Sequence, residues 1–283
     1  MMHKLVLSLT AERMTLEVVQ PVTPRGLLDW LRELLRRRKV RVMAAPPKVL
    51  ACIDVAGAIT PASLPAMLDQ ALVSLKTIYP TPLAGVDFEA QLGLSHARLG
   101  LLVLADTQAT SPTSSACEAY TQAWVKQMWH LEPATQIIRW EVLDDAQKLL
   151  ISCIDRSIFD SLDGFSRQHG MRFVGCKPAA LCALNSPEQR GQGNLPAASA
   201  GMTLVWTETG KNARRTSNVQ LLRFKGAQLA SIWRGWVPPP IADSSDEALE
   251  GALRRFQAHH QAQAGDALRR LHWPATSAES AVS

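Results

Sequence analysis

The first twenty residues contain two short apolar runs, at 5–9 and 14–19, separated by the polar sequence TAER. Short runs on either side of a polar turn predict a β-hairpin. The following segment, 23–40, places leucines at positions i, i+1, i+4, i+7 and i+8, which is one face of a helix. Thr23 and Pro24 suit the start of this helix, where a side-chain cap and a proline are both favoured.

Apolar periodicity continues through the N-terminal half. It predicts a buried strand at 48–55, a helix at 63–78 with its leucines on one face, a strand at 97–106 and a polar, proline-containing linker at 107–116.

The middle of the chain predicts a helix at 117–131, with Tyr120, Trp124, Met128 and Leu131 on one face. An alternating strand follows at 135–145. Residues 148–178 then read as strand, helix and strand, with Asp155 capping the helix and Gly170 ending it in a left-handed conformation. Two consecutive strands joined by a helix predict a right-handed parallel crossover.

The C-terminal part predicts a three-stranded meander over 202–236, preceded by a flexible connection at 185–200. A helix is expected over 244–273, opened by the capping pair Ser244 and Glu247 and weakened at Gly265. Strands, helices and a meander in this order are typical of an α/β chain with mixed sheets.

Composition adds few constraints to this picture. The chain has 283 residues, 47% of them hydrophobic, a net charge of +5 and a pI of about 9.1. Such a chain can bury real cores, and its mild basicity permits an anionic partner without requiring one. Five irregularly spaced cysteines, no export signal and no long apolar run indicate reduced thiols in a cytoplasmic protein without a membrane span.

Motifs for chemistry are missing. The sequence has no GxGxxG, HExxH or GxSxG, and the Gly210–Lys211 pair lacks the earlier glycine of a phosphate loop. We therefore predict no catalytic residue and no metal site. Two clusters are candidates for partner binding: the basic run Arg36, Arg37, Arg38, Lys39 and Arg41, and the group Trp233, Arg234 and Trp236.

Four sequence features together resemble a known family. They are WEVL at 140–143, LLISCI at 149–154, a helix closing in HG at 169–170, and KPAALCAL at 177–184. In this order they resemble the middle of the PilM and GspL proteins, actin-like cytoplasmic components of type IV pilus and type II secretion machines.

The resemblance implies an actin-like (RNase H-like) α/β fold with mixed sheets flanked by helices in two lobes. It implies an N-terminal subdomain at 1–110, a central α/β subdomain at 111–200, and a meander with a C-terminal helix at 201–283. In actin-like ATPases the two phosphate-facing hairpins carry aspartate and glycine. Here the corresponding positions hold Ser8 and Thr10 in the first hairpin, and Glu208 and Gly210 in the second.

A hairpin without glycine keeps the backbone away from a phosphate, and one without aspartate holds no Mg²⁺. The resemblance thus implies a non-enzymatic scaffold that is peripheral to the inner membrane and needs no cofactor. Its expected partner is the cytoplasmic segment of a membrane-anchored assembly protein, with an assembly ATPase as a further partner. Two alternatives stay open. One is an active actin-like ATPase or phosphotransferase that binds ATP through Ser8, Thr10, Glu208 and Gly210. The other, which the lack of a recognition pattern disfavours, is a basic nucleic-acid adaptor.

Overall fold

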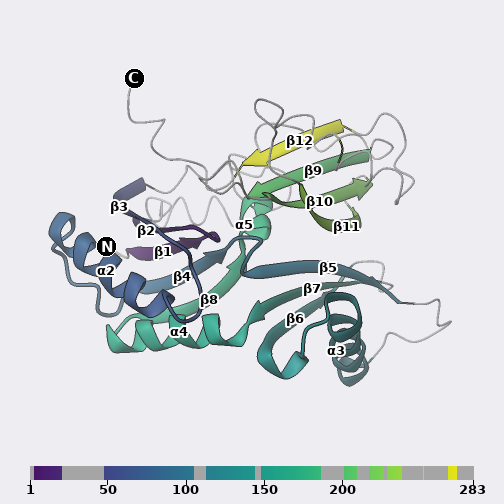
Figure 1. The fold of residues 1–283 in the computed structure, drawn as a ribbon, viewed down its shortest axis with the longest axis horizontal. Coiled ribbons are helices and arrows are strands. Elements are labelled where there is room, and N and C mark those ends of the chain that lie inside the picture. The colour runs from purple at the N-terminus through teal and green to yellow at the C-terminus, as the bar shows by residue number, and fades with distance from the viewer. Residues whose placement is uncertain are drawn as a thin grey trace, which may run out of the picture.

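The described part of the chain forms three β-sheets with helices packed against them (Figure 1). The computed structural model describes residues 3–20, 48–104, 113–143, 148–185, 201–208, 217–225, 228–237, 251 and 267–272. The predicted helix at 23–40, which contains the basic run, lies outside these residues. So do Gly210 and most of the predicted helix at 244–273.

The largest sheet has five strands in the order β3-β2-β1-β4-β8. Their bounds are Lys4–Leu9 (β1), Arg13–Gln20 (β2), Lys48–Ala56 (β3), Asp87–Leu92 (β4) and Arg172–Pro178 (β8). The first three strands pair antiparallel, so the hairpin prediction is confirmed, whereas β1 pairs with β4, and β4 with β8, in parallel. This is a mixed sheet, as predicted.

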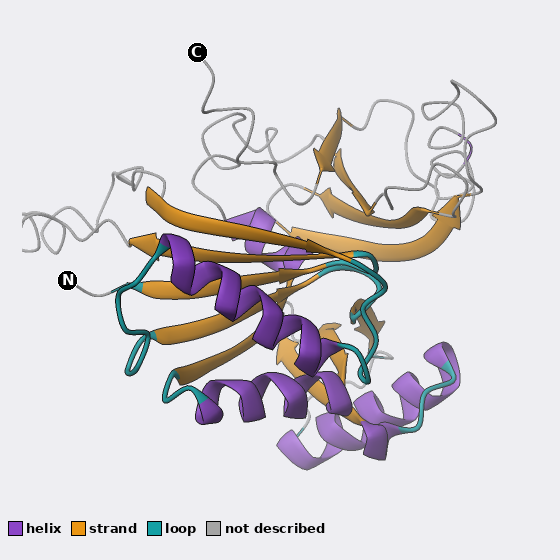
Figure 2. Ribbon diagram, turned by 60° about the vertical axis from the view of Figure 1, so that its left-hand side comes forward, coloured by secondary structure: helices purple, strands orange, loops and turns teal. Residues whose placement is uncertain are grey.

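One face of the five-stranded sheet is apolar, because side chains alternate along each strand. On β1, Leu5, Leu7 and Leu9 are fully buried in the main core. Helices α2 (Leu64–Ile78) and α4 (Arg156–Gln168) cover this face (Figure 2). The predicted leucine face of α2 is confirmed, since its buried positions follow helical spacing and pack into the same core.

Two strands of this sheet correct the predictions. The pattern analysis missed β4, the strand that pairs with β1, although Phe88, Ala90 and Leu92 alternate there with three polar residues. The strand predicted as buried at 48–55 is β3, which lies at the sheet edge and of which only Ala51 is buried. An edge strand has a neighbour on one side only, so its apolar composition does not ensure burial.

The opposite face of the five-stranded sheet carries a buried charge. Glu89 of β4 is 4% exposed, and its Oε2 atom accepts hydrogen bonds from Lys4 Nζ at 2.6 Å and Lys177 Nζ at 3.0 Å. The two lysines lie on β1 and β8, the strands on either side. Burial raises the pKa of Glu89, but the hydrogen bonds from Lys4 and Lys177 outweigh it, so the pKa is lowered overall. The ionised carboxylate therefore links three neighbouring strands.

A second sheet has three antiparallel strands in the order β5-β7-β6. They are Ala97–Val103 (β5), Gln136–Val142 (β6) and Lys148–Asp155 (β7), and the 3-10 turn η1 (Pro133–Thr135) leads into β6. Helix α3 (Ser114–Trp129) packs on one face through a core of Cys117, Val125, Leu149, Ile151 and Cys153.

The predicted apolar face of α3 is wrong at Tyr120 and Met128, whereas Trp124 and Leu131 pack against the core. Tyr120 and Met128 are 55% and 58% exposed, and the buried residues are Cys117, Thr121 and Val125. These small side chains allow the helix to lie close to the sheet, while the rings of Trp124 and Trp129 meet edge to face over Gly100. The helix also starts at Ser114, earlier than predicted, with Thr113 as its cap.

The strand–helix–strand unit at 148–178 has the predicted elements but a different topology. The Asp155 side chain accepts a hydrogen bond from the Ser157 amide at 2.8 Å, and Gly170 has a φ of 66°, so both predicted ends of α4 are confirmed. However, β7 belongs to the three-stranded sheet and β8 to the five-stranded sheet, so the unit is no crossover within one sheet. The sheets consequently do not follow the predicted bound at residue 110, because β5 and β8 each pair with strands on its other side.

The third sheet has four strands in the order β11-β10-β9-β12. They are Gly201–Glu208 (β9), Ser217–Lys225 (β10), Gln228–Val237 (β11) and Ala267–His272 (β12). The meander of β9, β10 and β11 is confirmed, but 267–272 was predicted as helix and forms a strand parallel to β9. Pairing with the open edge of β9 overrides the helical preference of its Ala, Leu and Arg residues.

The short helix α5 (Ala179–Asn185) follows β8 and lies between the five-stranded and four-stranded sheets (Figure 1). A separate apolar cluster joins these parts: Leu94, Leu99, Ala179, Ala180 and Leu222. Polar contacts add to it, because Gln220 Nε2 donates to the Leu99 carbonyl at 3.3 Å. The four-stranded sheet therefore packs on the rest of the chain through specific contacts.

Replacing Gly100 should destabilise the three-stranded sheet. A Cβ atom at this position would lie 2.3 Å from an atom of the Trp124 ring and 2.8 Å from the Trp129 ring. We expect Gly100→Ala to lower the free energy of unfolding by about 1–3 kcal/mol, with a change in tryptophan fluorescence. The matched control is Gly164→Ala, because Gly164 is an exposed helical residue with open space around its Cβ position. It should raise stability by about 0.5–1 kcal/mol. Equal effects of the two substitutions would contradict the packing of these rings.

Replacing Glu89 should reveal the buried carboxylate. We expect Glu89→Gln to lower the free energy of unfolding by about 2 kcal/mol at pH 7, measured by urea denaturation, because two lysines lose a charged acceptor. Because the pKa of Glu89 is lower in the folded than in the unfolded protein, the carboxylate stabilises the fold fully at pH values above its unfolded-state pKa, about 4.3. This stabilisation is lost as the pH falls through the folded-state pKa. The difference between the two proteins should therefore disappear in acid. Asp87→Asn, which removes the exposed ion pair with Arg172, is the control and should have a much smaller effect.

Candidate functional site

The tip of the β1–β2 hairpin, where an actin-like ATPase would approach a phosphate, is bound to other parts of the chain. Thr10 N–H donates to the Arg13 carbonyl at 2.9 Å, which closes a tight turn. The Ala11 and Glu12 carbonyls accept hydrogen bonds from the Ile59 and Gly57 amides, at 2.9 and 3.0 Å. These bonds fix the turn in place.

A fourth contact closes the turn from the side of β5. The Thr10 carbonyl lies 2.9 Å from His96 Nε2, and the Thr10 hydroxyl accepts from the Glu12 amide at 3.4 Å. The Glu12 amide, which a phosphate-binding hairpin could direct at its ligand, is thus already bound to a side chain of the same turn. The hairpin acts as a structural junction between the five-stranded and three-stranded sheets.

The predicted nucleotide residues do not form an acidic metal site in the described structure. Ser8 is 9% exposed and lies on the sheet face opposite α2 and α4, with Thr15 as its cross-strand neighbour. Glu208 is the last residue of β9 and pairs with Asn218, but its side chain is outside the described atoms, and Gly210 is outside the described residues. Among the residues described, no cluster of three or more His, Cys, Asp or Glu side chains could hold a metal.

A small cavity, here called the junction pocket, lies beside the hairpin tip. It has a volume of about 330 Å³ and is lined by Ala11, Ile59, Thr60, Pro61, Ser95, His96, Arg98, Leu131, Gln136, Cys153, Asp155 and Ile158. One wall comes from the end of the five-stranded sheet, and the other from the three-stranded sheet and the start of α4. Apolar walls with a few convergent polar groups are typical of sites that bind a ligand or a short peptide.

The polar groups of the junction pocket are fixed by the fold. Asp155 caps α4, Arg98 Nη1 donates to the Trp129 carbonyl at 3.4 Å, and Gln136 accepts from the Cys153 thiol at 3.2 Å. Sequence analysis identified Asp155 only as a helix cap and missed the pocket. Its residues come from distant parts of the chain, and no motif or spacing connects them.

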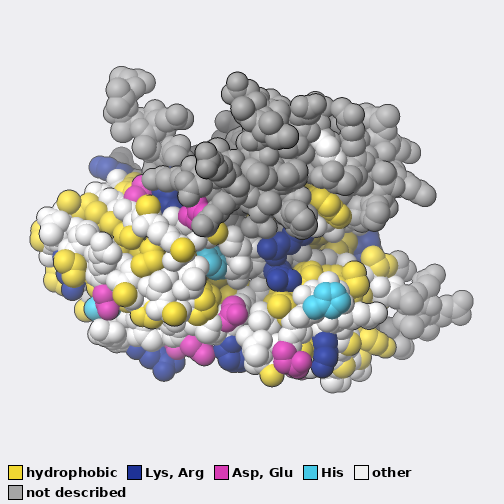
Figure 3. All heavy atoms as spheres, in the orientation of Figure 1, with side chains coloured by type: hydrophobic (Ala, Val, Ile, Leu, Met, Phe, Trp, Pro, Cys, Tyr) yellow, Lys and Arg dark blue, Asp and Glu magenta, His cyan; other side chains and the backbone are white. Residues whose placement is uncertain are grey.

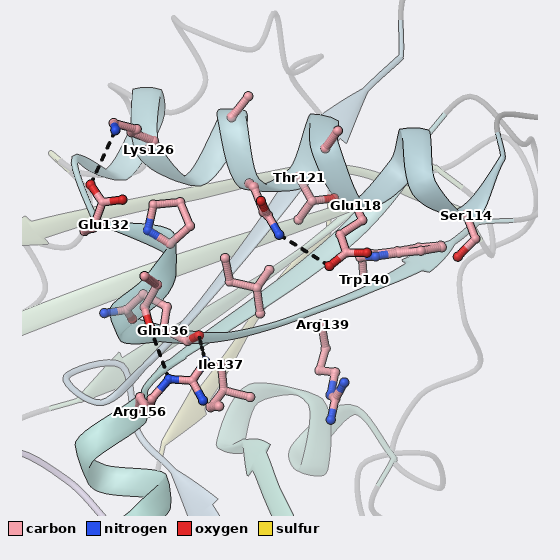
Figure 4. Close-up of a pocket in the computed structure, with 16 residues that line it drawn as sticks. Ser114, Glu118, Thr121, Lys126, Glu132, Gln136, Ile137, Arg139, Trp140 and Arg156 are labelled. Atoms are coloured by element: carbon pink, nitrogen blue, oxygen red, sulfur yellow. Dashed lines mark hydrogen bonds and ion pairs between the residues drawn. The ribbon is translucent and has the colours of Figure 1, made fainter.

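A larger groove of about 1050 Å³, here called the α3 groove, lies between α3 and β6 (Figure 4). Small and polar side chains of α3 line one side, and residues 136–140 of β6 the other. Lys126 pairs with Glu132 at 3.4 Å, and Gln122 donates to Glu118 at 3.3 Å, so several charges are satisfied within the groove. Gln136 lines both this groove and the junction pocket.

The predicted partner-binding residues fall in two places. Arg36, Arg37, Arg38, Lys39 and Arg41 lie outside the described residues. Trp233 and Arg234 lie on β11, and Arg234 Nη2 donates to the Leu94 carbonyl at 2.5 Å, which is a contact within the chain. Trp236 lies on the same strand, with its side chain outside the described atoms. Partner binding by these residues stays a prediction.

The thiols of Cys153 and Cys176 are poor nucleophiles. Burial raises the pKa of Cys153 to about 11 and of Cys176 to about 12, so both are protonated at neutral pH.

On the molecular face in Figure 3, acidic and basic side chains of described residues are interspersed. That arrangement does not resemble a basic nucleic-acid surface. Among the helices that the structure describes, none combines the length and the apolar composition of a membrane-spanning segment.

No protein-family model matches this sequence, and no curated protein matches it. Solved structures do. A chain of a PilM–PilN type IV pilus biogenesis complex aligns with 95% of this chain and 81% of its own length, at 14% identity and a TM-score of 0.60. A Bacteroides thetaiotaomicron protein of unknown function, with an actin-like ATPase fold, aligns with 98% of this chain and 84% of its own, at 13% identity and a TM-score of 0.51.

These likenesses extend over nearly the whole chain. The expectation from the sequence resemblance is thereby confirmed at the level of fold. The chain has an α/β actin-like fold, and it is similar in structure to a chain of the PilM–PilN complex.

Proposed function

We propose that this protein is a non-enzymatic cytoplasmic scaffold at the inner face of a type IV pilus or type II secretion-like assembly. It would bind the cytoplasmic segment of a membrane-anchored partner, and an assembly ATPase is a further candidate partner. The observation that carries the proposal is the hairpin tip at Thr10. The fold is actin-like, but this turn has neither aspartate nor glycine, and its polar groups are bound within the chain.

The junction pocket is the site that we assign to the membrane partner's segment. Its apolar walls, which include Ile59, Leu131 and Ile158, suit one or two apolar side chains. Arg98 and His96 at its polar side suit a carbonyl or a carboxylate of the bound segment. A pocket formed by fixed groups needs little reorganisation on binding, which favours affinity for a short peptide.

The active ATPase or phosphotransferase is the alternative, since one structural relative is described as having an actin-like ATPase fold. The proposal predicts no heat of binding and no thermal shift with ATP and Mg²⁺, because the tip of the first hairpin carries neither aspartate nor glycine and its Glu12 amide is already bound to the Thr10 hydroxyl. Clear binding of ATP that is lost in Glu208→Ala would favour the alternative.

The docking site can be tested by photocrosslinking in cells. A photoreactive phenylalanine analogue at Ser95, an exposed residue that lines the junction pocket, should crosslink to the cytoplasmic segment of an inner-membrane protein. The matched control places the same analogue at Ser114, an exposed residue of the α3 groove. Crosslinks from both positions to the same segment, or from Ser95 only to soluble enzymes, would contradict the proposed site.

A further inference from the structure

Strand β6 has an open edge. In the described part of the chain it pairs only with β7, and its other side faces the α3 groove (Figure 4). Because α3 and β6 are separated by this groove, an extended segment has room to lie along the strand. Open edges carry unpaired backbone groups that can pair with another chain.

The hydrogen-bond pattern determines which backbone groups point outward. Leu143 N–H donates to the Lys148 carbonyl at 3.0 Å, so Leu143 directs its backbone groups toward β7. Backbone groups alternate in direction along an antiparallel strand. The backbone N–H and C=O groups of Arg139 and Glu141 therefore also point toward β7. Those of Ile138, Trp140 and Val142 point outward, away from β7.

The start of the edge supports this assignment. Gln136 belongs to the outward set, and its carbonyl accepts a hydrogen bond from Arg156 Nη2 at 3.3 Å. Arg156 Nε also binds the Ala134 carbonyl, at 3.1 Å. The arginine thereby closes the first part of the edge and leaves the outward groups of 138–142 for a partner.

We propose that two copies of this protein pair edge to edge through β6, antiparallel, about a two-fold axis that passes through Trp140. In this register Trp140 lies opposite Trp140 of the second copy, and Ile138 lies opposite Val142. Each of these opposed pairs can exchange two backbone hydrogen bonds. The two three-stranded sheets would become one continuous sheet, with both α3 helices on the same face.

Charge complementarity favours a second copy as the occupant. Arg139 and Glu141 are exposed, and no salt bridge or side-chain hydrogen bond engages either of them in the described structure. In the proposed register each Arg139 lies opposite Glu141 of the second copy. These are non-hydrogen-bonded positions, where opposed side chains approach most closely. Centring the axis on Arg139 or Glu141 instead would place like charges opposite each other.

The apolar face of the strand is also self-complementary. Ile138 and Trp140 pack at the edge of the core beneath α3, whereas Val142 is 41% exposed. Pairing would place Val142 beside Ile138 of the second copy and bring the two Trp140 rings together under the α3 helices. A contact through one strand is small, so we expect a weak dimer that forms at high concentration.

Sedimentation velocity over a wide range of concentrations tests the proposal, which does not depend on the proposed function. Wild-type protein should show reversible dimerisation. Arg139→Glu alone and Glu141→Arg alone should each weaken it about tenfold or more, because each variant opposes like charges twice. The double variant should recover the dimer. An equimolar mixture of the two single variants should form a heterodimer, since every opposed pair is then of opposite charge.

Arg167→Glu is the matched control, because this side chain is exposed on α4, away from the edge. It should dimerise like the wild type. Thermal unfolding of each variant would show whether the fold is kept. A monomer at every concentration, or a dimer that is insensitive to both charge reversals, would overturn the proposal. A mixture of the two single variants that stays monomeric would also overturn the proposal. The same holds for a β6 edge that pairs only with a strand of another protein.

Discussion

The parallel pairing of β1 with β4 is the contact on which the other parts of this structure depend. It joins residues 4–9 to residues 87–92 and so brings the N-terminal hairpin beside a strand far along the chain. The Gly93 amide continues this pairing by donating to the Leu9 carbonyl at 2.7 Å. The turn that follows β4 therefore lies next to the hairpin tip, and His96 reaches the Thr10 carbonyl. Without this pairing the junction pocket would not form, and β5 would not be held beside the hairpin tip.

The hydrogen bonds of the hairpin tip are the feature on which the proposed scaffold function rests. Phosphate transfer needs backbone amides and a metal directed at the transferred group. Here the carbonyls of residues 10–12 bind neighbouring loops, and a threonine hydroxyl binds the Glu12 amide. These contacts stabilise the junction of two sheets. Of these three turn residues, Ala11 also lines the junction pocket.

The sequence predicted those elements whose signals are local. The hairpin, α2, the ends of α4 and the meander all follow from periodicity, caps or a glycine at a helix end. It failed where partners distant in the chain decide the outcome. Strand β4 mixes apolar and charged residues because it pairs on both sides and holds Glu89, and β12 forms because β9 offers an open edge. Nothing local marks Tyr120 as exposed or gathers His96, Arg98 and Gln136 around one cavity. The actin-like fold was predicted through the family resemblance rather than from these elements alone.

Strand β1 separates the residues that hold the fold together from the residues on its polar face. Leu5, Leu7 and Leu9 face the core and hold the sheet to α2 and α4, whereas Lys4 and Ser8 face the other side. The two sets of residues alternate, so they change independently. Replacing a metal-binding aspartate by serine leaves the apolar set intact and removes a charge whose burial requires a cation nearby. On the same polar face the remaining buried carboxylate, Glu89, has two lysines as its cations. The apolar face of β1 thus holds the architecture together, and changes among the polar residues of its other face need not destabilise the fold.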